Sequence, residues 1–202
     1  MNIETIMRTS AVIPVLVIDD AAIARPLAEA LVAGGLRVLE VTLRTPAALD
    51  AIREMKQVPG AIVGAGTVVS TDQFEQVMDA GGEFIVSPGL TEGLGRVIVD
   101  SGVPFLPGIA TAGDIMRGYD LGLRYFKFFP AETSGGLKAL KALAAPFHEA
   151  RFCPTGGITE ASAPEWLAFE KVLCVGGSWV TPSGAAMPDV EAKARAAAGL
   201  RA

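Results

Sequence analysis

The sequence predicts an α/β protein that folds as a (β/α)8 barrel, and three observations lead to this fold class. Short apolar runs that end in Gly, Pro, Ser or Thr alternate along the chain with longer amphipathic segments. The alternation repeats eight times at nearly regular spacing, as expected for parallel strands joined by crossover helices. The length of 202 residues is near the compact limit of such a barrel, about 200 residues. An open, doubly wound sheet is the alternative arrangement of the same elements.

A single domain is expected over residues 1–202. Half of the residues are hydrophobic, 19% are charged, and glycine (23) and proline (13) recur along the whole length. This composition excludes a disordered chain and is typical of an α/β protein whose sheet is buried on both faces. No Ser/Gly-rich or charge-rich stretch divides the chain into two units.

The expected strands are continuous apolar runs, which is the pattern of a buried parallel sheet. In chain order they are AVIPVLVI, RVLEVTL, AIVGAGT, EFIVSPG, PFLPGI, YFKFFP, RFCPTGG and VLCVGGS. The third run contains Gly64 and Gly66 but lacks the third glycine of a dinucleotide-binding fingerprint, so that motif is excluded.

The segments between the strands have apolar residues at helical spacing. The expected helices are Ala21–Ala33, Pro46–Met55, Thr71–Ala80, Thr91–Ser101, Asp114–Leu121, Leu137–Ala145, Ala161–Leu167 and Pro188–Ala198. Thr45 before Pro46 is typical of a helix start, because threonine can accept a hydrogen bond from a free amide and proline fits the first turn. Ser70 or Thr71, together with Asp72, can cap the next helix in the same way.

Charge and hydropathy exclude several classes of partner. The net charge is −5 and the basic residues are scattered without a patch, so neither nucleic acid nor an anionic membrane is expected as a partner. No run reaches the roughly 20 apolar residues that cross a bilayer, and MNIETIMRTS at the N-terminus has no basic cluster before its short apolar run. We therefore expect a cytoplasmic protein that acts on a small molecule.

Metal and redox chemistry lack the residues that they need. Cys153 and Cys174 lie in separate apolar strands rather than in a C-x-x-C pair, so we expect reduced core thiols. His148 is the one histidine, which leaves too few groups for a His-ligated metal or a Ser-His-Asp triad. Ser178 in GGSWV does not match the G-x-S-x-G nucleophile elbow. Neither a metal nor a cofactor is expected.

Two of the expected strands carry charged residues in otherwise apolar surroundings. With a period of two, the sixth strand has Tyr125, Lys127 and Phe129 on one face. The second strand has Glu40 and Arg44 on one face in the same way. If both faces point inward, a lysine, a glutamate and an arginine meet near the carboxyl ends of the strands, where barrel active sites lie.

The surroundings of Lys127 suggest a nucleophilic amine. Aromatic rings exclude water and favour the free amine over the ammonium, and Arg44 acts in the same direction while Glu40 opposes it. A free amine can attack a carbonyl substrate to give a carbinolamine and then an iminium ion, which permits cleavage of a nearby carbon–carbon bond. Glu40 could then act as the general base through a water. The alternative is a structural ion pair between Lys127 and Glu40.

The remaining strand ends carry small and polar residues. They are Thr67, Pro88, Pro107, Thr155, Gly156, Gly157, Gly176, Gly177 and Ser178. Arg44 can bind a substrate carboxylate with two hydrogen bonds while Thr67 adds a hydroxyl, or it can be a solvated residue at a helix start. The glycines after the last two strands can offer backbone amides to a phosphate, or they can form tight turns.

Several motifs match one known family in the same order along the chain. Between about Pro14 and Trp179 they are LVAGGLRVLEVTLRTPAALDAI, AIVGAGTV, SPGLTE, FKFFPAE, FCPTGGI and VLCVGGSW. On these residues the chain resembles the 2-dehydro-3-deoxy-6-phosphogluconate (KDPG) and 4-hydroxy-2-oxoglutarate (KHG) aldolases, class I enzymes of the Entner–Doudoroff pathway. The tail after Pro182 departs most from the family's pattern.

The resemblance implies a role for each candidate position. Lys127 in FKFFPAE would form the Schiff base, and Glu40 in EVTLRT would carry protons. Arg44 and Thr67 would bind the pyruvate carboxylate. Pro88 and Phe129 would shape the pyruvate pocket, and Thr155 would set the stereochemistry at the hydroxyl-bearing carbon. The phosphate end would consist of Gly156, Gly157, Gly176, Gly177 and Ser178. The resemblance also implies a homotrimer of barrels.

The expected reaction is the reversible cleavage of KDPG, a phosphorylated 2-keto acid, to pyruvate and glyceraldehyde 3-phosphate. Cleavage of KHG to pyruvate and glyoxylate is expected as a second activity. One alternative is an aldolase for the galactonate epimer of KDPG. Another, from a different class, is a non-catalytic phosphate-binding barrel in which Lys127 and Glu40 are structural.

Overall fold

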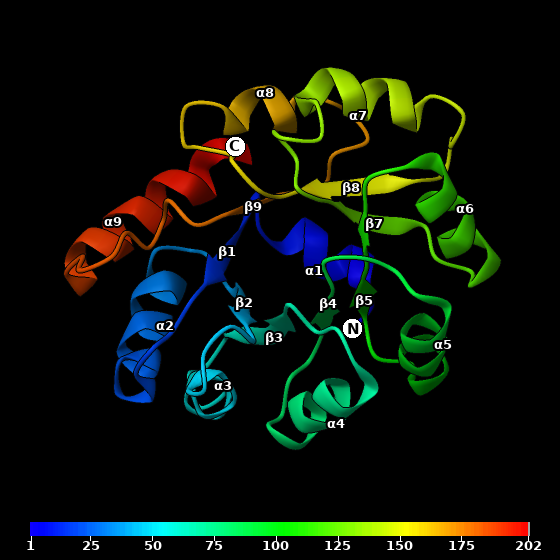
Figure 1. The fold of residues 1–202 in the computed structure, drawn as a ribbon. Coiled ribbons are helices and arrows are strands. Elements are labelled where there is room, and N and C mark those ends of the chain that lie inside the picture. Colours follow the sequence, from blue (N-terminus) through cyan, green and yellow to red (C-terminus); the bar gives the residue numbers. More distant parts are fainter. Residues whose placement is uncertain (202) are drawn as a thin grey trace.

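The structure is a computed structural model that describes residues 1–201, with parallel strands at its centre and helices around them (Figure 1). The outer helices follow one another around the strands in chain order, as the colours show, and the first short helix lies among the strands. Each pair of neighbouring strands is parallel. The predicted α/β class is therefore confirmed.

The described strands form two parallel sheets. The first has the spatial order β5 (Phe105–Leu106), β4 (Ile85–Val86), β3 (Ile62–Gly66), β2 (Val38–Thr42), β1 (Val12–Leu16) and β9 (Val175–Gly177). The second has the order β6 (Gly108–Ile109), β7 (Tyr125–Phe128) and β8 (Arg151–Pro154). A strand is present in each predicted run, but the fifth run is divided into two.

The division of the fifth run, PFLPGI, occurs at Pro107 between β5 and β6. Proline has no N–H to donate to a neighbouring strand, so the ladder is interrupted there. Its carbonyl still accepts a hydrogen bond from the Lys127 N–H at 2.8 Å. At the other edge of the second sheet, parallel bridges join Phe152 to Val172 and Thr155 to Gly176. Pro107 thus connects β5 to β6 along the chain, and the two bridges link β8 and the residue after it to the segment that contains β9.

The predicted helices are present close to their expected bounds. They are α2 (Ala24–Ala33), α3 (Ala48–Met55), α4 (Thr71–Asp79), α5 (Glu92–Ser101), α6 (Ala112–Asp120), α7 (Gly136–Ala144), α8 (Ala163–Leu167) and α9 (Met187–Ala198). A 3-10 turn, η1 (Ala21–Ile23), precedes α2, and another, η2 (Gly199–Arg201), follows α9. Ser70 caps α4 as predicted, because its hydroxyl accepts a hydrogen bond from the Gln73 N–H. The predicted cap at Thr45 is wrong. Its hydroxyl donates to the Ile18 carbonyl instead, and α3 starts three residues later without a side-chain cap.

One helix, α1 (Ile3–Thr9), is absent from the sequence-based prediction. Seven residues are too few for a helical period to stand out. The start is nevertheless marked, since the Asn2 side chain accepts a hydrogen bond from the Thr5 N–H. A salt bridge between Arg8 Nε and Glu4 Oε1, 2.9 Å apart and one helical turn from each other, also stabilises the helix.

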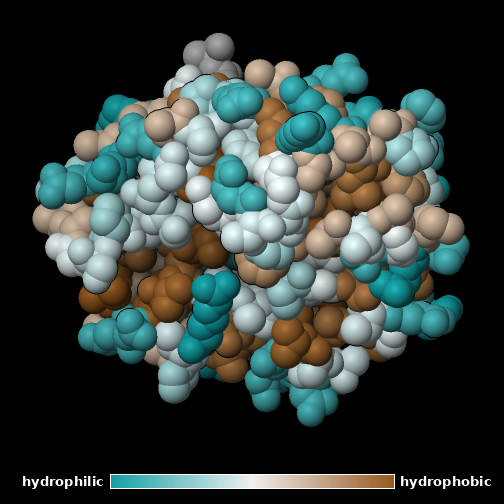
Figure 2. Space-filling model, turned by 45° about the horizontal axis from the view of Figure 1, so that its top comes forward, coloured by the Kyte–Doolittle hydropathy of each residue, from teal (hydrophilic) through white to brown (hydrophobic). Residues whose placement is uncertain are grey.

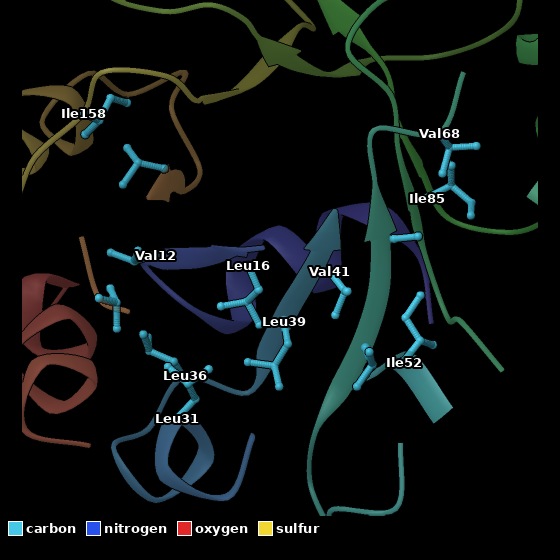
Figure 3. Close-up of a cluster of buried hydrophobic side chains, with 14 of the residues drawn as sticks. Val12, Leu16, Leu31, Leu36, Leu39, Val41, Ile52, Val68, Ile85 and Ile158 are labelled. Atoms are coloured by element: carbon cyan, nitrogen blue, oxygen red, sulfur yellow. The ribbon is translucent and has the colours of Figure 1, made fainter. Parts of the chain in front are cut away.

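An outer apolar layer fills the space between the strands and the surrounding helices. Figure 3 shows Leu39 and Val41 of β2 in this layer, together with Leu31 of α2 and Ile52 of α3. All four side chains are fully buried. Since successive strand residues face opposite sides, the residues between Leu39 and Val41 and on either side of them must face the other way.

An inner apolar cluster lies on that other side of the strands. It contains Ile6 and Met7 of α1, Val38 of β2, and the partly buried Tyr125 at the start of β7. Helix α1 therefore packs against strands from both sheets. The inner position of Val38 and Tyr125 confirms the predicted strand faces, because Glu40 and Lys127 lie two residues further on.

The surface has no single dominant polar or apolar region in the view of Figure 2, where hydrophilic residues surround smaller apolar areas. Val17 and Ile23 are among the large apolar side chains that are exposed. Among residues 1–201, no helix combines the length and apolar character needed to span a bilayer. In the same residues, His, Cys, Asp and Glu side chains form no cluster of three that could hold a metal ion.

A hydrogen bond ties α1 to β7. The Tyr125 hydroxyl donates to Glu4 Oε2 at 2.5 Å. This hydrogen bond and a second one from Arg8 lower the pKa of Glu4. Burial, followed by the contact with Glu4, raises the pKa of Tyr125. The contact fixes the N-terminal helix to the strand that carries Lys127.

We predict that Tyr125→Phe lowers the melting temperature at pH 7 and that the difference from wild type shrinks in acid. The folded pKa of Glu4 lies below its ordinary value of 4.5. Its contribution to stability is therefore full above that pH and is lost as pH falls through the folded pKa. Thermal unfolding followed by circular dichroism from pH 7 to pH 3 measures the effect. Glu4→Gln should lose a similar amount of stability at pH 7, and its difference from wild type should also shrink in acid, because only wild type carries the titrating carboxylate. A pH-independent Tyr125→Phe deficit would contradict the assignment.

Candidate active site

The site centres on a buried contact between Lys127 of β7 and Glu40 of β2. Lys127 Nζ lies 3.1 Å from Glu40 Oε1, and the two residues are 5% and 3% exposed. Lys127 Nζ also lies 5.1 Å from the centroid of the Phe129 ring. The two residues predicted to be catalytic thus meet as the strand faces require. Contact at this distance permits direct proton transfer between the amine and the carboxylate.

The pairing of β7 directs Lys127 inward. Its neighbours Phe126 and Phe128 are buried in the outer apolar layer, so Lys127 faces the inner side. In the ladder, Lys127 lies opposite Gly108 of β6 and Cys153 of β8. Since hydrogen bonds on both edges hold the strand, the lysine backbone has little freedom.

The position of Glu40 depends on a glycine in the next strand. Glu40 pairs with Gly64 of β3, and Gly66 follows on the same face. A Cβ atom at Gly66 would lie 2.1 Å from Glu40 Oε1, so this position has no room for a side chain. Gly66 therefore provides the space that the carboxylate occupies.

Arg44 and Thr67 lie beyond the carboxyl ends of two paired strands. Thr42 is opposite Gly66, and the Leu43 N–H donates to the Gly66 carbonyl at 2.9 Å. Arg44 is exposed, whereas Thr67 is half-buried. Thr67 has φ of 62°, a left-handed conformation that is unfavourable for a β-branched residue and often marks a functional site. The structure thus places both residues on the same rim, at the ends of β2 and β3.

Pro88 lies in the loop after β4, next to the strand that borders Lys127. A Cβ atom at Gly108 would lie 2.2 Å from the Pro88 carbonyl oxygen. The absence of a side chain at Gly108 therefore lets the Pro88 backbone approach β6. Because Gly108 is opposite Lys127, Pro88 lies one strand away from the lysine.

Thr155 follows β8 and is buried. It forms the bridge to Gly176, and its Oγ1 lies 3.9 Å from Cys153 Sγ. A Cβ atom at Gly176 would lie 2.2 Å from Thr155 Oγ1. Gly176 therefore makes room for the threonine hydroxyl, and a side chain there would displace it.

The five residues of the expected phosphate end fall into two groups. Gly156 and Gly157 have positive φ angles of 104° and 80°. Glycine is favoured in this conformation, which is typical of a tight turn. Gly176 and Gly177 belong to β9 and are buried, so the tight-turn interpretation is wrong for these two. A Cβ atom at Gly177 would lie 1.8 Å from the Trp179 ring. Packing against this ring therefore requires glycine at position 177. Ser178 follows directly and is exposed.

Ser178 also lines a surface groove of about 540 Å³. The groove lies between the loop after β1, which contains Asp19 and Asp20, and the segment that leads to α9. Neither Lys127 nor Glu40 contributes to its walls. The groove therefore adjoins the expected phosphate end at Ser178 and not the buried pair of Lys127 and Glu40.

Gly66 and Gly108 are parts of the site that the sequence motifs did not predict. Both are glycines inside or at the start of strands, where a missing side chain often marks a close approach of other groups. That signal could have indicated them. The partner of each, Glu40 for one and Pro88 for the other, is set by the arrangement of strands and could not be read locally.

Comparison with known proteins gives the same family from sequence and from structure. A family model for KDPG and KHG aldolase matches residues 3–195. The 2-dehydro-3-deoxy-phosphogluconate aldolase of Zymomonas mobilis is 60% identical over 189 residues, covering 94% of this chain and 90% of that protein. The KHG/KDPG aldolase of Escherichia coli K12 is 54% identical over 183 residues, covering 90% of this chain and 86% of that protein.

Two solved structures share the fold over nearly the whole chain. The KDPG aldolase of Zymomonas mobilis ZM4 with 3-phosphoglycerate has a TM-score of 0.97 and 57% identity, with 98% of this chain and 96% of that chain covered. The KDPG aldolase of Legionella pneumophila, with pyruvate captured as a covalent carbinolamine intermediate, has a TM-score of 0.95 and 41% identity, with 98% of each chain covered. The chain therefore belongs to the KDPG and KHG aldolase family.

Proposed function

We propose that this carbon–carbon lyase cleaves KDPG to pyruvate and glyceraldehyde 3-phosphate through a Schiff base on Lys127. The observation that carries the proposal is the 3.1 Å contact between the buried Lys127 amine and the Glu40 carboxylate. A lysine in direct contact with a carboxylate can lose its proton to that group and become a nucleophile. The covalent carbinolamine of pyruvate in the Legionella pneumophila relative supports the same chemistry.

The first half of the reaction builds the iminium ion. Lys127 Nζ attacks the C2 ketone, and the tetrahedral carbinolamine forms. Glu40, which takes up a proton from the amine, returns one to the carbinolamine hydroxyl, and water leaves. The resulting iminium nitrogen is positive and withdraws electrons from the adjacent carbons.

The second half breaks the carbon–carbon bond. Glu40 removes the C4 hydroxyl proton through a bound water, the C3–C4 bond breaks, and its electron pair moves toward the iminium to give an enamine. Glyceraldehyde 3-phosphate leaves as the aldehyde product. Protonation of the enamine at C3 and hydrolysis of the iminium then release pyruvate and regenerate the lysine.

The substrate is held by groups on the same rim. Arg44 and Thr67 bind the carboxylate, Pro88 and Phe129 border the three carbons that become pyruvate, and Thr155 contacts the hydroxyl-bearing carbon. The phosphate lies at the amides and hydroxyl of Gly156, Gly157, Gly176, Gly177 and Ser178. The 3-phosphoglycerate in the Zymomonas mobilis relative, a phosphorylated three-carbon acid, supports a phosphate site in this family. No metal or cofactor takes part in this scheme.

Two features bear on the choice of substrate. The Escherichia coli relative is named for both KHG and KDPG, which supports cleavage of KHG as a second activity here. The relatives at 54% and 60% identity carry the gluconate name, which favours KDPG over its galactonate epimer. The aldolase names of these relatives disfavour the non-catalytic alternative, in which the ion pair is structural, and trapping of the Schiff base tests it directly.

We also propose that the two sheets form one closed (β/α)8 barrel. The separation of β5 from β6 by a single residue, Pro107, supports closure on one side, and the bridges that link Thr155 and Phe152 to the last strand segment support it on the other. This barrel would form one domain over residues 1–202, of which residue 202 lies outside the described part. The protein is expected to be a homotrimer, as the family resemblance implies, and to be cytoplasmic, as expected from its short apolar runs.

We predict that sodium borohydride and pyruvate together add a permanent mass to the protein at Lys127. Reduction of the iminium fixes the pyruvyl group to the lysine nitrogen. Lys127→Arg and Lys127→Ala should show no added mass and should lose at least about 10⁴-fold in kcat. Intact-mass spectrometry and peptide mapping locate the adduct, with Lys138→Arg as a control on an exposed lysine. An unmodified wild-type protein would rule out the Schiff-base mechanism.

Glu40→Gln should lower kcat by about 10²–10⁴-fold, the usual range for loss of a general acid or base. Glutamine keeps the size of the side chain but cannot accept and return the proton. Steady-state KDPG cleavage measures kcat, and borohydride trapping measures pyruvate binding separately. If kcat stays near the wild-type value, another group carries the proton.

Gly66→Ala is predicted to impair catalysis through Glu40. The added methyl would meet Glu40 Oε1 at 2.1 Å and displace the carboxylate from Lys127. A shift of about 1 Å at a catalytic group can cost on the order of 10²-fold in rate. Kinetics of Gly66→Ala should be compared with those of Gly113→Ala, where the nearest atom to an added Cβ is 3.7 Å away. Equal rates for the two variants would show that Glu40 is not confined by Gly66.

A further inference from the structure

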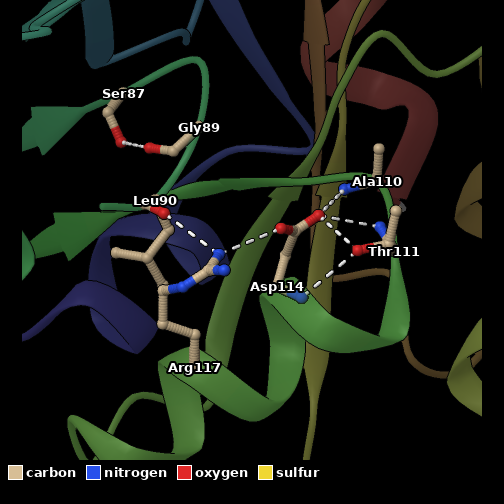
Figure 4. Close-up of polar contacts among 7 residues, drawn as sticks. All are labelled: Ser87, Gly89, Leu90, Ala110, Thr111, Asp114 and Arg117. Carbon is tan, nitrogen blue, oxygen red and sulfur yellow. Dashed lines mark hydrogen bonds and ion pairs between the residues drawn. The ribbon is translucent and has the colours of Figure 1, made fainter. Parts of the chain in front are cut away.

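We propose that Arg117 is a positioning residue that holds the Pro88 loop, residues 87–90, in place beside Lys127. Arg117 Nη1 donates to the Leu90 carbonyl at 3.3 Å and lies 3.2 Å from Asp114 Oδ1 (Figure 4). Leu90 closes the loop after β4, whereas Arg117 and Asp114 belong to α6, which follows β6. One guanidinium group therefore joins the loop after β4 to helix α6. The role rests on the proposed function, in which Pro88 borders pyruvate.

The partner of Arg117 is itself fixed by a network of hydrogen bonds. Asp114 Oδ2 accepts hydrogen bonds from the Ala110 N–H at 3.1 Å, the Thr111 N–H at 2.9 Å and the Thr111 hydroxyl at 2.8 Å (Figure 4). Burial raises the pKa of Asp114, but these hydrogen bonds outweigh burial, and the pKa is lowered. Asp114 is thus a charged, immobile acceptor that directs the guanidinium toward Leu90.

The Pro88 loop packs directly against β6, the strand that pairs with Lys127. Its backbone packs on Gly108, and Gly108 is opposite Lys127 in the ladder. Within the loop, the Ser87 hydroxyl donates to the Gly89 carbonyl at 2.6 Å. The Leu90 side chain is buried, so the end of the loop is anchored on the apolar side as well. A shift of the Leu90 carbonyl would therefore be transmitted to Pro88.

The exposure of the Arg117 side chain indicates that it positions the Pro88 loop and contributes little to the stability of the whole fold. It is 46% exposed, and an ion pair with that access to water contributes little to global stability. Its loss is therefore expected to leave the fold intact. The effect should appear in the affinity of the pocket for pyruvate rather than in the proton transfers at Lys127 and Glu40.

Borohydride trapping at a series of pyruvate concentrations tests the proposal. For Arg117→Ala we expect the half-saturating pyruvate concentration to rise about fivefold, as for loss of one half-exposed charge-assisted hydrogen bond. The maximal extent of trapping and kcat should stay within about twofold of wild type, since the reacting groups are untouched. Arg117→Lys should restore part of the affinity. Met116→Ala, at an exposed neighbour on the same helix, is the matched control.

Amide hydrogen exchange provides a readout that is independent of activity. The Ser87 amide of the loop, which donates to the Leu106 carbonyl at 3.4 Å, should exchange faster in Arg117→Ala than in wild type and should be unchanged in Met116→Ala. The proposal is overturned if Arg117→Ala and Met116→Ala have the same half-saturating pyruvate concentration. If wild type traps no pyruvate, the proposed function fails, and the exchange rates still decide whether Arg117 holds the loop. If Arg117→Ala does not fold, Arg117→Lys is compared with Met116→Ala in both measurements.

Discussion

The contact between Lys127 and Glu40 is the interaction on which the rest of the site depends. Both groups are almost fully buried, and removing two ionisable side chains from water costs several kcal/mol each. Their mutual attraction offsets that cost only at contact distance and in a fixed geometry. The structure meets this requirement by placing each residue within a paired strand, one in each sheet. Either residue without the other would be a buried charge with no partner. The pair therefore depends on the strand pairing that holds both residues in place.

The alternation of side chains along the strands connects this pair to the cores. In β7, Phe126 and Phe128 pack in the outer layer, whereas Tyr125 and Lys127 face inward. A register shift of one residue would place the lysine among the outer apolar side chains and expose the aromatic rings. The apolar layers therefore fix the direction of the amine more strongly than any single hydrogen bond does. Helix α1 adds to this, because it packs on the inner cluster and binds Tyr125.

Three glycines leave room for the groups of the site at the carboxyl ends of the strands. Gly66 leaves space for Glu40, Gly108 for the Pro88 backbone, and Gly176 for the Thr155 hydroxyl. In each case the glycine lies in one strand and the group that uses the space belongs to a neighbour. Close packing leaves no slack for a methyl group at these positions. The shape of the pocket is thus encoded partly by missing side chains, while the polar groups supply its chemistry.

The alternation of strands with crossover helices and the chemical groups of the site could be predicted from the amino-acid sequence, whereas helix α1 and the division of the fifth strand could not. Alternation is a local property of extended backbone, so the sequence predicted which residues share a face with Glu40 and with Lys127, whereas the packing of the two apolar layers decided that these faces point inward. Only the tertiary structure decided the contacts: Lys127 and Glu40 are 87 residues apart, and Arg117 reaches Leu90 across 27. It also decided that Thr45 bonds to Ile18 instead of capping α3, and that Pro107 divides a strand. Local propensity cannot supply these results, because each depends on which distant groups come within hydrogen-bonding distance when the chain packs.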